Sequence, residues 1–405
     1  MNDYSTKEIL QYIEETDVKF IRLTFCDVFG QVKNISVMPG ELNRAFAHGI
    51  AIDASAIAGF GGEVYSDLLL HPDPGTIAIL PWRPEHGRVV RMFCDITTPD
   101  GAPFACDTRA LLRRAAADAR AAGIRFSFGA EMEFYLFRTD ETGAPTAEPF
   151  DHAGYMDVAP ADRGENVRRE ICLTLEKMGI QPESSHHEEG PGQNEIDFRY
   201  SDPLTAADQA VTFRTVVQTV AARNGLAADF SPKPLPHQPG SGFHINISAK
   251  PTDGRDVQPA LVAGILHHIA DMTRFLNPTD ASFDRLGVCK APQYITWSRE
   301  NRSQLIRIPA AAGEFRRAEL RSPDSAANPY LAFALLIYAA LDGIGHGWTP
   351  DAPADFNLFT ARPDQLQSYR MLPRSRAEAA ALAAQSAFIA AHLPRTIVDA
   401  YCSEN

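Results

Sequence analysis

Alternating apolar and polar positions recur in four short runs of the chain, and a period of two residues predicts β-strands. The runs span residues 129–137, 194–198, 242–248 and 316–321. Each run has one apolar face and one face of charged or hydrogen-bonding side chains. The polar positions are, in chain order, Glu131, Glu133, Tyr135, Glu195, Asp197, His244, Asn246, Ser248, Arg317, Glu319 and Arg321.

Two interpretations of these polar faces are open. Each face could point to solvent on an antiparallel sheet, which is a common arrangement. Convergence on one site is favoured because Glu, Asp, His and Arg are poor strand formers, yet they recur here at alternating positions. Crowded carboxylates cannot all stay ionised without cations, and carboxylates with one imidazole suit Mg²⁺ or Mn²⁺. The interleaved arginines would bind phosphate and carboxylate oxygens.

Divalent metals, arginines and carboxylate ligands are the groups that phosphoryl transfer requires. The sequence contains no Gly-x-x-x-x-Gly-Lys-Ser/Thr loop and no Gly-x-Gly-x-x-Gly motif opening a helix. We therefore expect ATP to be held by the sheet and the metals rather than by a phosphate-binding loop.

Longer stretches with helical spacing alternate with the strands. They predict helices over residues 107–122, 165–178, 203–225, 258–276 and 330–344, and an alanine-rich run predicts one more over 376–391. Near the N-terminus, Ser5 and Glu8 form a candidate capping box for a helix through Glu15, and two β-rich runs follow at 18–25 and 32–37.

The length of 405 residues favours two domains. The Pro- and Gly-containing stretch at residues 97–103 is the best linker candidate. The sequence thus predicts an α+β fold with an N-terminal domain over residues 1–103 and a larger domain over residues 104–405.

Composition narrows the functional class. A net charge of −13 argues against nucleic acid or an anionic membrane as the main partner. The longest apolar run, at residues 331–341, is too short to span a bilayer, and residues 1–7 lack the pattern of a signal peptide. The six cysteines contain no Cys-x-x-Cys pair, so reduced thiols and a cytoplasmic location are expected.

Seven motifs in order resemble those of bacterial glutamine synthetase, over about residues 18 to 345. They are Glu131-Met-Glu133, His186-His-Glu188-Glu-Gly-Pro-Gly-Gln-Asn-Glu195, Gly240-Ser-Gly-Phe-His244, Asn277-Pro-Thr with Arg285, Asn301-Arg-Ser with Ile306-Arg-Ile-Pro, Arg317-Ala-Glu319-Leu-Arg321, and Ala326-Ala-Asn-Pro-Tyr. Isolated motifs often arise by chance, but seven in order at similar spacings do not.

The resemblance implies a β-grasp N-terminal domain and a catalytic domain whose curved antiparallel sheet forms a funnel. It also implies homo-oligomeric hexameric rings, single or double, with each site at a subunit interface. In that family, ATP phosphorylates the γ-carboxylate of glutamate, and ammonia then attacks the acyl phosphate. The expected cofactors are ATP and two to three Mg²⁺ or Mn²⁺ ions per site.

The family's site residues map onto this sequence by motif. One metal is matched by Glu133, Glu188 and Glu195, and the second by Glu131, His244 and Glu319. Substrate contacts are matched by Arg285, Arg321, Gly240 and Tyr155. Nucleotide and phosphate contacts are matched by Glu183, Tyr200, Ser248, Arg302, Arg307 and Arg317. The resemblance gives catalytic roles to Arg302, Arg321 and Asp53, the last donated across a subunit interface to an ammonium site.

The sequence departs from the family at the flap that follows Arg285. There Lys290 stands where the family has a glutamate that accepts a proton from ammonium, and the segment is one residue shorter. Pro239 replaces a usual asparagine, and residues 53–56 read Asp-Ala-Ser-Ala. The chain also stops short of the C-terminal extension that ties two rings together, which makes a double ring less secure.

Three functions are therefore open: glutamine synthesis, a ligase joining glutamate or a similar acid to another amine, and a non-catalytic homologue that binds nucleotide or glutamate. The ligase readings are favoured because all six metal-ligand positions and the arginines are present. His186 and His187 are left off the ligand set, since adjacent strand residues point to opposite faces. Cys289 in the flap is expected to be inert.

Overall fold

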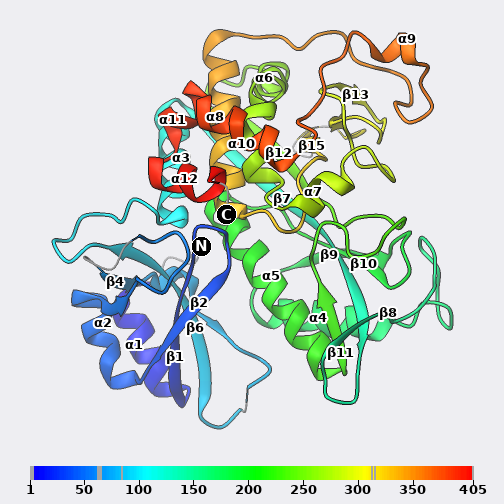
Figure 1. Cartoon of the computed structure of the whole chain (residues 1–405). Helices are drawn as coiled ribbons and strands as arrows, with labels where there is room; N and C mark the ends of the chain where they lie inside the picture. The colour runs from blue at the N-terminus through cyan, green and yellow to red at the C-terminus, as the bar shows by residue number, and fades with distance from the viewer. Residues whose placement is uncertain (1–3, 62–65, 84, 312, 314–315, 404–405) are drawn as a thin grey trace.

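The computed structural model describes residues 4–61, 66–83, 85–311, 313 and 316–403 (Figure 1). Its first part is a sheet of six strands in the order β2-β1-β6-β4-β3, with β5 paired to β6. The strands are β1 (Val18–Cys26), β2 (Val32–Val37), β3 (Ile50–Asp53), β4 (Asp67–Pro72), β5 (Ala78–Ile79) and β6 (Arg88–Thr97). The helices of this part are α1 (Thr6–Glu15), η1 (Pro39–Glu41), α2 (Leu42–His48) and η3 (Pro74–Thr76).

The predicted start of α1 is confirmed. The Ser5 hydroxyl accepts a hydrogen bond from the Glu8 amide at 3.3 Å, and the Glu8 carboxylate accepts one from the Ser5 amide at 2.7 Å. This reciprocal capping box satisfies two backbone donors that a helix start leaves without partners.

The second part is built on a curled sheet of nine strands in the order β13-β14-β15-β12-β7-β10-β9, with β11 and β8 also paired to β7. Strand β7 (Ile124–Thr139) is 16 residues long and forms the centre of this sheet. The others are β8 (Pro145–Pro149), β9 (Pro182–His187), β10 (Gln193–Phe198), β11 (Leu226–Asp229), β12 (Phe243–Pro251), β13 (Trp297–Arg299), β14 (Ile306–Ile308) and β15 (Ala318–Leu320).

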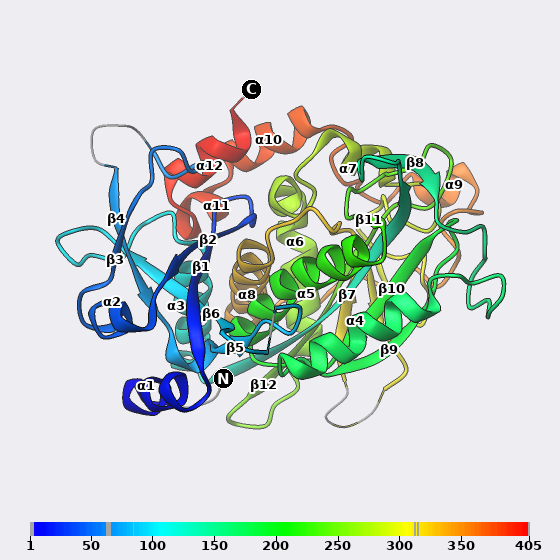
Figure 2. The same ribbon diagram turned by 90° about the horizontal axis from the view of Figure 1, so that it is seen from below.

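Helices cover the apolar face of this sheet, and α5, α6 and α8 lie together beside β7 in Figure 2. The helices are α3 (Thr108–Ala121), α4 (Glu165–Lys177), α5 (Pro203–Arg223), α6 (Gln258–Leu276), α7 (Asp280–Arg285), α8 (Pro329–His346), α9 (Pro363–Leu366), α10 (Arg376–Gln385), α11 (Ala387–His392) and α12 (Arg395–Cys402). Phe128 on β7 stacks on Phe333 of α8 with ring centroids 4.3 Å apart. The apolar side chains of the alternating strands therefore enter the core, which leaves their polar faces together on the other side.

Helix α8 is long and apolar enough to cross a membrane by length and composition alone. However, 72% of its 18-residue window is buried inside the protein. It is therefore a core helix, and it is the only one in the described ranges that passes this test.

The prediction of one helix over residues 376–391 is wrong, because Ser386 divides it into α10 and α11. Ser386 has φ −74° and ψ 122°, and its hydroxyl accepts a hydrogen bond from the Ile389 amide at 3.2 Å. The same hydroxyl donates to Asp271 on α6 at 2.6 Å. A serine that caps a new helix and anchors to a neighbour outweighs the helical propensity of the alanines around it.

The proposed linker is a short hydrogen-bonded turn rather than an extended connection. Its Thr98 amide donates to the Ala102 carbonyl and its Gly101 amide to the Thr98 carbonyl, both at 2.9 Å. Just after it, buried Arg109 on α3 donates to Asp73 at 2.8 Å, to Asp95 at 3.0 Å, and to Asp208 on α5 at 2.9 Å. This arginine joins the first sheet's segments to the helices of the second part.

A second junction gathers distant segments at one backbone carbonyl. The Asn328 side-chain amide donates to the Val28 carbonyl at 2.9 Å, and the Tyr401 hydroxyl donates to the same carbonyl at 3.0 Å. The loop after β1, the start of α8 and helix α12 therefore meet at Val28.

Candidate active site

The register of the curled sheet brings the four predicted polar faces side by side. Glu131 on β7 is directly opposite His244 on β12 and, on its other side, opposite Asp197 on β10. Glu133 is opposite Glu195 of β10 in the same ladder. Side chains at directly opposed positions lie close enough to interact, so the pairing itself concentrates the carboxylates.

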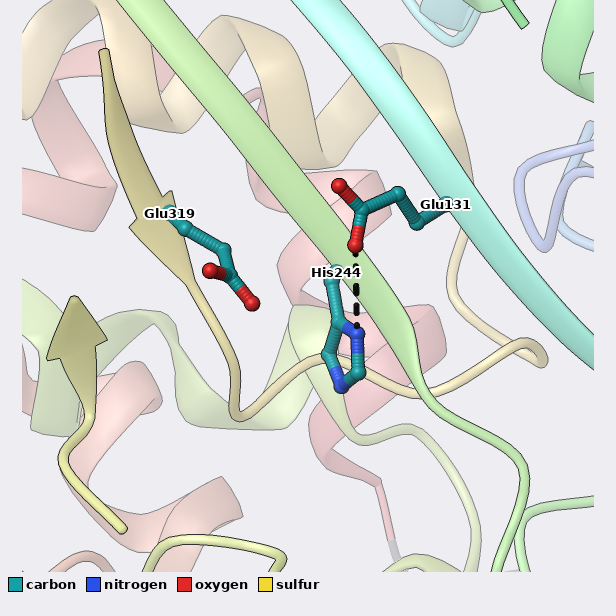
Figure 3. A group of neighbouring side chains, drawn as sticks. All are labelled: Glu131, His244 and Glu319. Carbon is teal, nitrogen blue, oxygen red and sulfur yellow. Dashed lines mark ion pairs between the residues drawn. The ribbon is translucent and has the colours of Figure 1, made fainter. Parts of the chain in front are cut away.

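Glu131, His244 and Glu319 point toward one another from three strands (Figure 3). Each offers one ligand atom, and these atoms lie within 4.8 Å of one another. His244 Nδ1 lies 3.6 Å from Glu131 Oε2. Two carboxylates and an imidazole at this spacing can hold a divalent ion.

Glu319 is buried between two arginines. Its Oε2 accepts a hydrogen bond from Arg307 at 2.7 Å, and its Oε1 accepts one from Arg321. Burial alone would raise the carboxyl pKa, but the charges of Arg321, His244 and Arg307 outweigh it and lower the pKa of Glu319 to about 2. Glu319 is therefore an anion at neutral pH even without a metal.

The remaining carboxylates form two further groups. Glu133 and Glu195 gather with His244, while Glu188 gathers with Glu195 and His186. Burial, with a contribution from Glu133, raises the pKa of Glu188 to about 8. Burial, with contributions from Asp197 and Glu133, raises the pKa of Glu195 well above its ordinary value. Carboxyl groups crowded in this way need protons or cations, so the donor set fits hard divalent ions such as Mg²⁺ or Mn²⁺.

Two cavities meet at Glu131, which lies in the wall of both. The larger has a volume of about 330 Å³ and is lined by four of the residues predicted to contact the nucleotide, Glu183, Tyr200, Ser248 and Arg317. The smaller has a volume of about 210 Å³ and is lined by the predicted substrate contacts Gly240, Tyr155, Arg285 and Arg321, and by Arg302. A phosphate donor in one cavity and an acceptor in the other would face each other across the carboxylates.

Arg285 provides a buried cation at the inner end of the smaller cavity. It is the last residue of α7 and only 3% exposed. Its guanidinium donates to the carbonyls of Ser322 at 2.8 Å and Arg321 at 3.3 Å. These bonds fix the direction of the group, and its fork geometry suits a carboxylate.

Three of the predicted residues do not line either cavity in the described part of the chain. Glu319 and Arg307 form an ion pair with each other at 2.7 Å. Asp53 lies at the end of β3 in the first sheet, where it is exposed and accepts a hydrogen bond from the Ser55 amide at 2.9 Å. One copy of the chain therefore does not bring Asp53 to the carboxylate cluster.

The structure also assembles residues that sequence reasoning missed. His186 Nε2 lies 3.2 Å from Glu195 Oε1 and reaches the carboxylate group from β9, although both histidines were left off the ligand set. His187 points the other way, is fully buried and lies 2.8 Å from Asp151. Strand alternation allows only one of two adjacent residues to face the site, so one of the two histidines could have been included. The sequence analysis predicted no strand at residues 182–187, and it therefore could not say which one.

Gln193 is a further missed residue. Its side-chain amide donates to Glu133 and to the Gly240 carbonyl, both at 3.1 Å, and its side-chain oxygen accepts from the Gly190 amide at 2.9 Å. It therefore ties the turn between β9 and β10 to the loop that carries Gly240.

Two departures noted in the sequence line the smaller cavity. Lys290 forms an ion pair with Glu189, and both residues line the cavity. Pro239 also lines it, and its carbonyl accepts a hydrogen bond from the Tyr135 hydroxyl at 2.6 Å.

Comparison with protein families matches nearly the whole chain. Residues 17–99 match the family model described as glutamine synthetase, beta-Grasp domain, and residues 105–404 match the one described as glutamine synthetase, catalytic domain. A glutamine synthetase of Clostridium saccharobutylicum is 44% identical over 373 residues, covering 89% of this chain and 84% of that protein. A glutamine synthetase of Methanosarcina mazei is 44% identical over 396 residues, covering 94% of this chain and 88% of that protein.

Solved structures give a similar result. The structure titled "GmaS/ADP complex-Conformation 1" superposes with a TM-score of 0.88 at 28% identity, covering 97% of this chain and 94% of that chain. The structure titled "Apo GmaS without ligand" has a TM-score of 0.87 at 29% identity, with coverage of 97% and 93%.

Proposed function

Because this chain belongs to the glutamine synthetase family and is an ATP-dependent carbon–nitrogen ligase, we propose that it converts the γ-carboxylate of glutamate into an amide. In the first step a γ-carboxylate oxygen attacks the γ-phosphorus of ATP, and ADP leaves. In the second step the amine nitrogen attacks the acyl carbon, phosphate leaves, and one proton is lost from the nitrogen.

The single observation that carries this proposal is the meeting of two cavities at a carboxylate cluster. Glu131 lines both cavities. The ligand atoms of Glu131, His244 and Glu319 lie within 4.8 Å of one another. Divalent ions held by the two sets of ligands predicted from the sequence would neutralise the phosphates and the attacking carboxylate. That arrangement is suited to passing a phosphoryl group from the nucleotide side to the acid side.

Different side chains of the two cavities would then bind the acid, the transferring phosphate and the nucleotide. Arg285 holds the α-carboxylate of the acid at the closed end of the smaller cavity. Arg321 and Arg302 lie on its wall and stabilise charge on the transferring phosphate. Tyr200, Glu183, Ser248 and Arg317 hold the nucleotide, while Arg307 orients Glu319.

Two nucleophiles are candidates for the second step, ammonia and an organic primary amine. The 44% identity to proteins called glutamine synthetase favours ammonia. Lys290, a cation on the wall of the smaller cavity, favours an organic primary amine. Both reactions form a γ-glutamyl amide, so one assay separates them.

The test is phosphate release from ATP with glutamate and Mg²⁺ or Mn²⁺, with ammonium compared against a panel of primary amines. Stimulation by ammonium alone would make the protein a glutamine synthetase, and stimulation by another amine would make it a ligase for that amine. Binding of ATP without phosphate release with any amine would overturn the ligase proposal in favour of a non-catalytic homologue. Mass spectrometry of the amide identifies the product.

We further propose that the working unit is a ring in which a neighbouring copy supplies Asp53, since one copy leaves that residue away from the cluster. Mixing inactive Asp53→Asn subunits with inactive Glu319→Gln subunits should restore activity, because some interfaces then combine two intact halves. Light scattering that gives an active monomer would contradict the shared site.

A further inference from the structure

Two loops contribute residues to the wall of the smaller cavity, and one ion pair joins them. The first loop follows α7 and contains Cys289, Lys290 and Ala291, and the second is the turn between β9 and β10 that contains Glu189. The Lys290 ammonium donates to Glu189 Oε1. Residues 101 positions apart thus meet on the cavity wall.

The backbone of the first loop directs Lys290 toward its partner. Gly287, Cys289 and Lys290 have φ values of 80°, 47° and 69°. Only the glycine adopts this left-handed region without cost, so two side chains are held in a conformation that L-residues avoid. The Gly287 amide donates to the Ala291 carbonyl at 3.1 Å, and the Ala291 amide donates to the Val288 carbonyl at 3.1 Å. The turn is therefore closed on itself, and Lys290 is not a loose surface side chain.

The ion pair has two consequences for a nucleophile that enters here. Lys290 places a positive charge on the cavity wall, and this charge repels a protonated amine. It also binds an oxygen of Glu189, the most exposed carboxylate of the cavity, and so offsets a negative charge that would attract a cation. Lys290 and Glu189 have side chains 59% and 36% exposed, so the pair adds little to stability, yet its charges lie on the cavity wall.

Three uncharged residues line the same cavity. Pro239 and Ala291 lie on the wall with Cys289. They offer apolar contact to a carbon substituent and no charge to bind a cation.

We propose, building on the ligase function above, that Lys290 selects the amine by its charge state. The preferred nucleophile is a primary amine that is neutral at physiological pH and carries a carbon substituent, such as an electron-poor or aromatic amine. It arrives already deprotonated, with its substituent against Pro239, Cys289 and Ala291. Ammonium and strongly basic alkylamines are disfavoured because they arrive as cations.

Two amines of matched length separate charge from size. Ethylamine is a cation at pH 7.5, whereas 2,2,2-trifluoroethylamine is largely neutral. For the wild type, KM for trifluoroethylamine should lie at least ten-fold below KM for ethylamine and for ammonium. Fluorination also lowers nucleophilicity, which affects kcat, so the comparison is made in KM.

Variants of the pair give the decisive result. Lys290→Glu should lower KM for ethylamine and ammonium at least ten-fold and leave KM for trifluoroethylamine and for glutamate within two-fold. Glu189→Gln, which leaves the lysine without its carboxylate, should raise KM for ethylamine. Lys7→Glu, the same charge change on exposed α1, serves as the matched control and should change none of these values. Unchanged KM values for both cations in Lys290→Glu, or an equal effect in the control, would overturn the inference.

The outcome for Lys290 can be separated from that of the ligase proposal. Calorimetric titration of ammonium and ethylammonium into protein holding ADP, Mg²⁺ and glutamate needs no turnover. A gain of at least ten-fold in affinity for both cations in Lys290→Glu supports the inference even if no amine releases phosphate. Equal affinity in the variant and the wild type overturns it, whatever the activity.

Discussion

His186 Nε2 lies 3.2 Å from Glu195 Oε1, and the His186 ring packs edge-on against Tyr155 with centroids 5.4 Å apart. One imidazole therefore links the carboxylate cluster to a residue of the acid-side cavity. Because groups that orient metal ligands commonly change metal affinity 10–100-fold, His186→Asn should raise the half-saturating Mn²⁺ concentration at least about ten-fold. Titration calorimetry measures this, and His152→Asn on an exposed loop should leave it unchanged.

Glu319 is the anion between Arg307 and Arg321, and Glu319→Gln removes its charge without removing its shape. Breaking a buried ion pair leaves uncompensated charge, so the variant should lose about 3–5 kcal/mol of unfolding free energy in the absence of metal. It should also lose the thermal stabilisation that Mn²⁺ gives the wild type. Urea unfolding with and without Mn²⁺ checks both, and a full Mn²⁺ response in the variant would exclude Glu319 from the ligands.

Metal binding should release protons near neutral pH. Burial and neighbouring carboxylates raise the pKa of Glu188 to about 8 and of Asp197 to about 7, so the metal-free site holds protons that a metal must displace. Calorimetry of Mn²⁺ binding in buffers of different ionisation enthalpy should report net proton release at pH 7. The release should shrink above pH 9.

The same raised pKa values set the pH dependence of the metal-free protein. A carboxyl group whose pKa is raised by folding contributes stability that is complete below its unfolded pKa and is lost as pH rises through the folded value. The melting temperature in EDTA should therefore fall between pH 6 and 9, and saturating Mn²⁺ should reduce this fall. A melting temperature in EDTA that rises across this range would contradict the raised pKa values.

The function of Arg285 should depend on the forked geometry of its guanidinium donors and not only on its positive charge. Arg285→Lys keeps a cation but cannot make both bonds to Ser322 and Arg321 while also binding a carboxylate. Each lost charged hydrogen bond costs about 1.5–3 kcal/mol, so KM for glutamate should rise roughly 10- to 100-fold while KM for ATP changes little. Arg299→Lys, on exposed β13, is the control.

Arg109 should stabilise the whole chain. Arg109→Met leaves Asp73, Asp95 and Asp208 without their shared buried partner and should cost about 3–5 kcal/mol. Arg44→Met, which removes an exposed pair with Glu41, should cost less than about 1 kcal/mol. Urea denaturation of both variants tests the difference.

Local patterns predicted much of the fold. The helix bounds at α3, α5 and α8 follow from an N-terminal capping side chain and a glycine just past the last turn, and the alternation at β7, β10 and β12 follows from one buried face. Ser386 was misjudged because its decisive contact, with Asp271, is 115 residues away. The domain boundary at residues 103/104 stays a prediction, although the glutamine synthetase fold that the motifs implied is confirmed.

Site residues could be predicted where the two-residue alternation of a β-strand decides the direction of the side chain. That period placed Glu131, Glu133, Glu195 and His244 on converging faces. It could not place Lys290, whose direction depends on left-handed backbone at residues 289 and 290, or Gln193, whose three bonds join loops distant in sequence. The assignment of individual ligands to two metals also stays a prediction.

The carbonyl of Val28 receives one hydrogen bond from Tyr401, 373 residues later. On the ribosome, the loop after β1 emerges first, and 373 more residues must be added before that partner is made. Domains usually complete their folding in order during synthesis, and contacts of such long separation form late. For this chain, the N-terminal sheet can pair early, but its junction with α8 and α12 closes only once both helices have been made, and until then proteases can reach this seam.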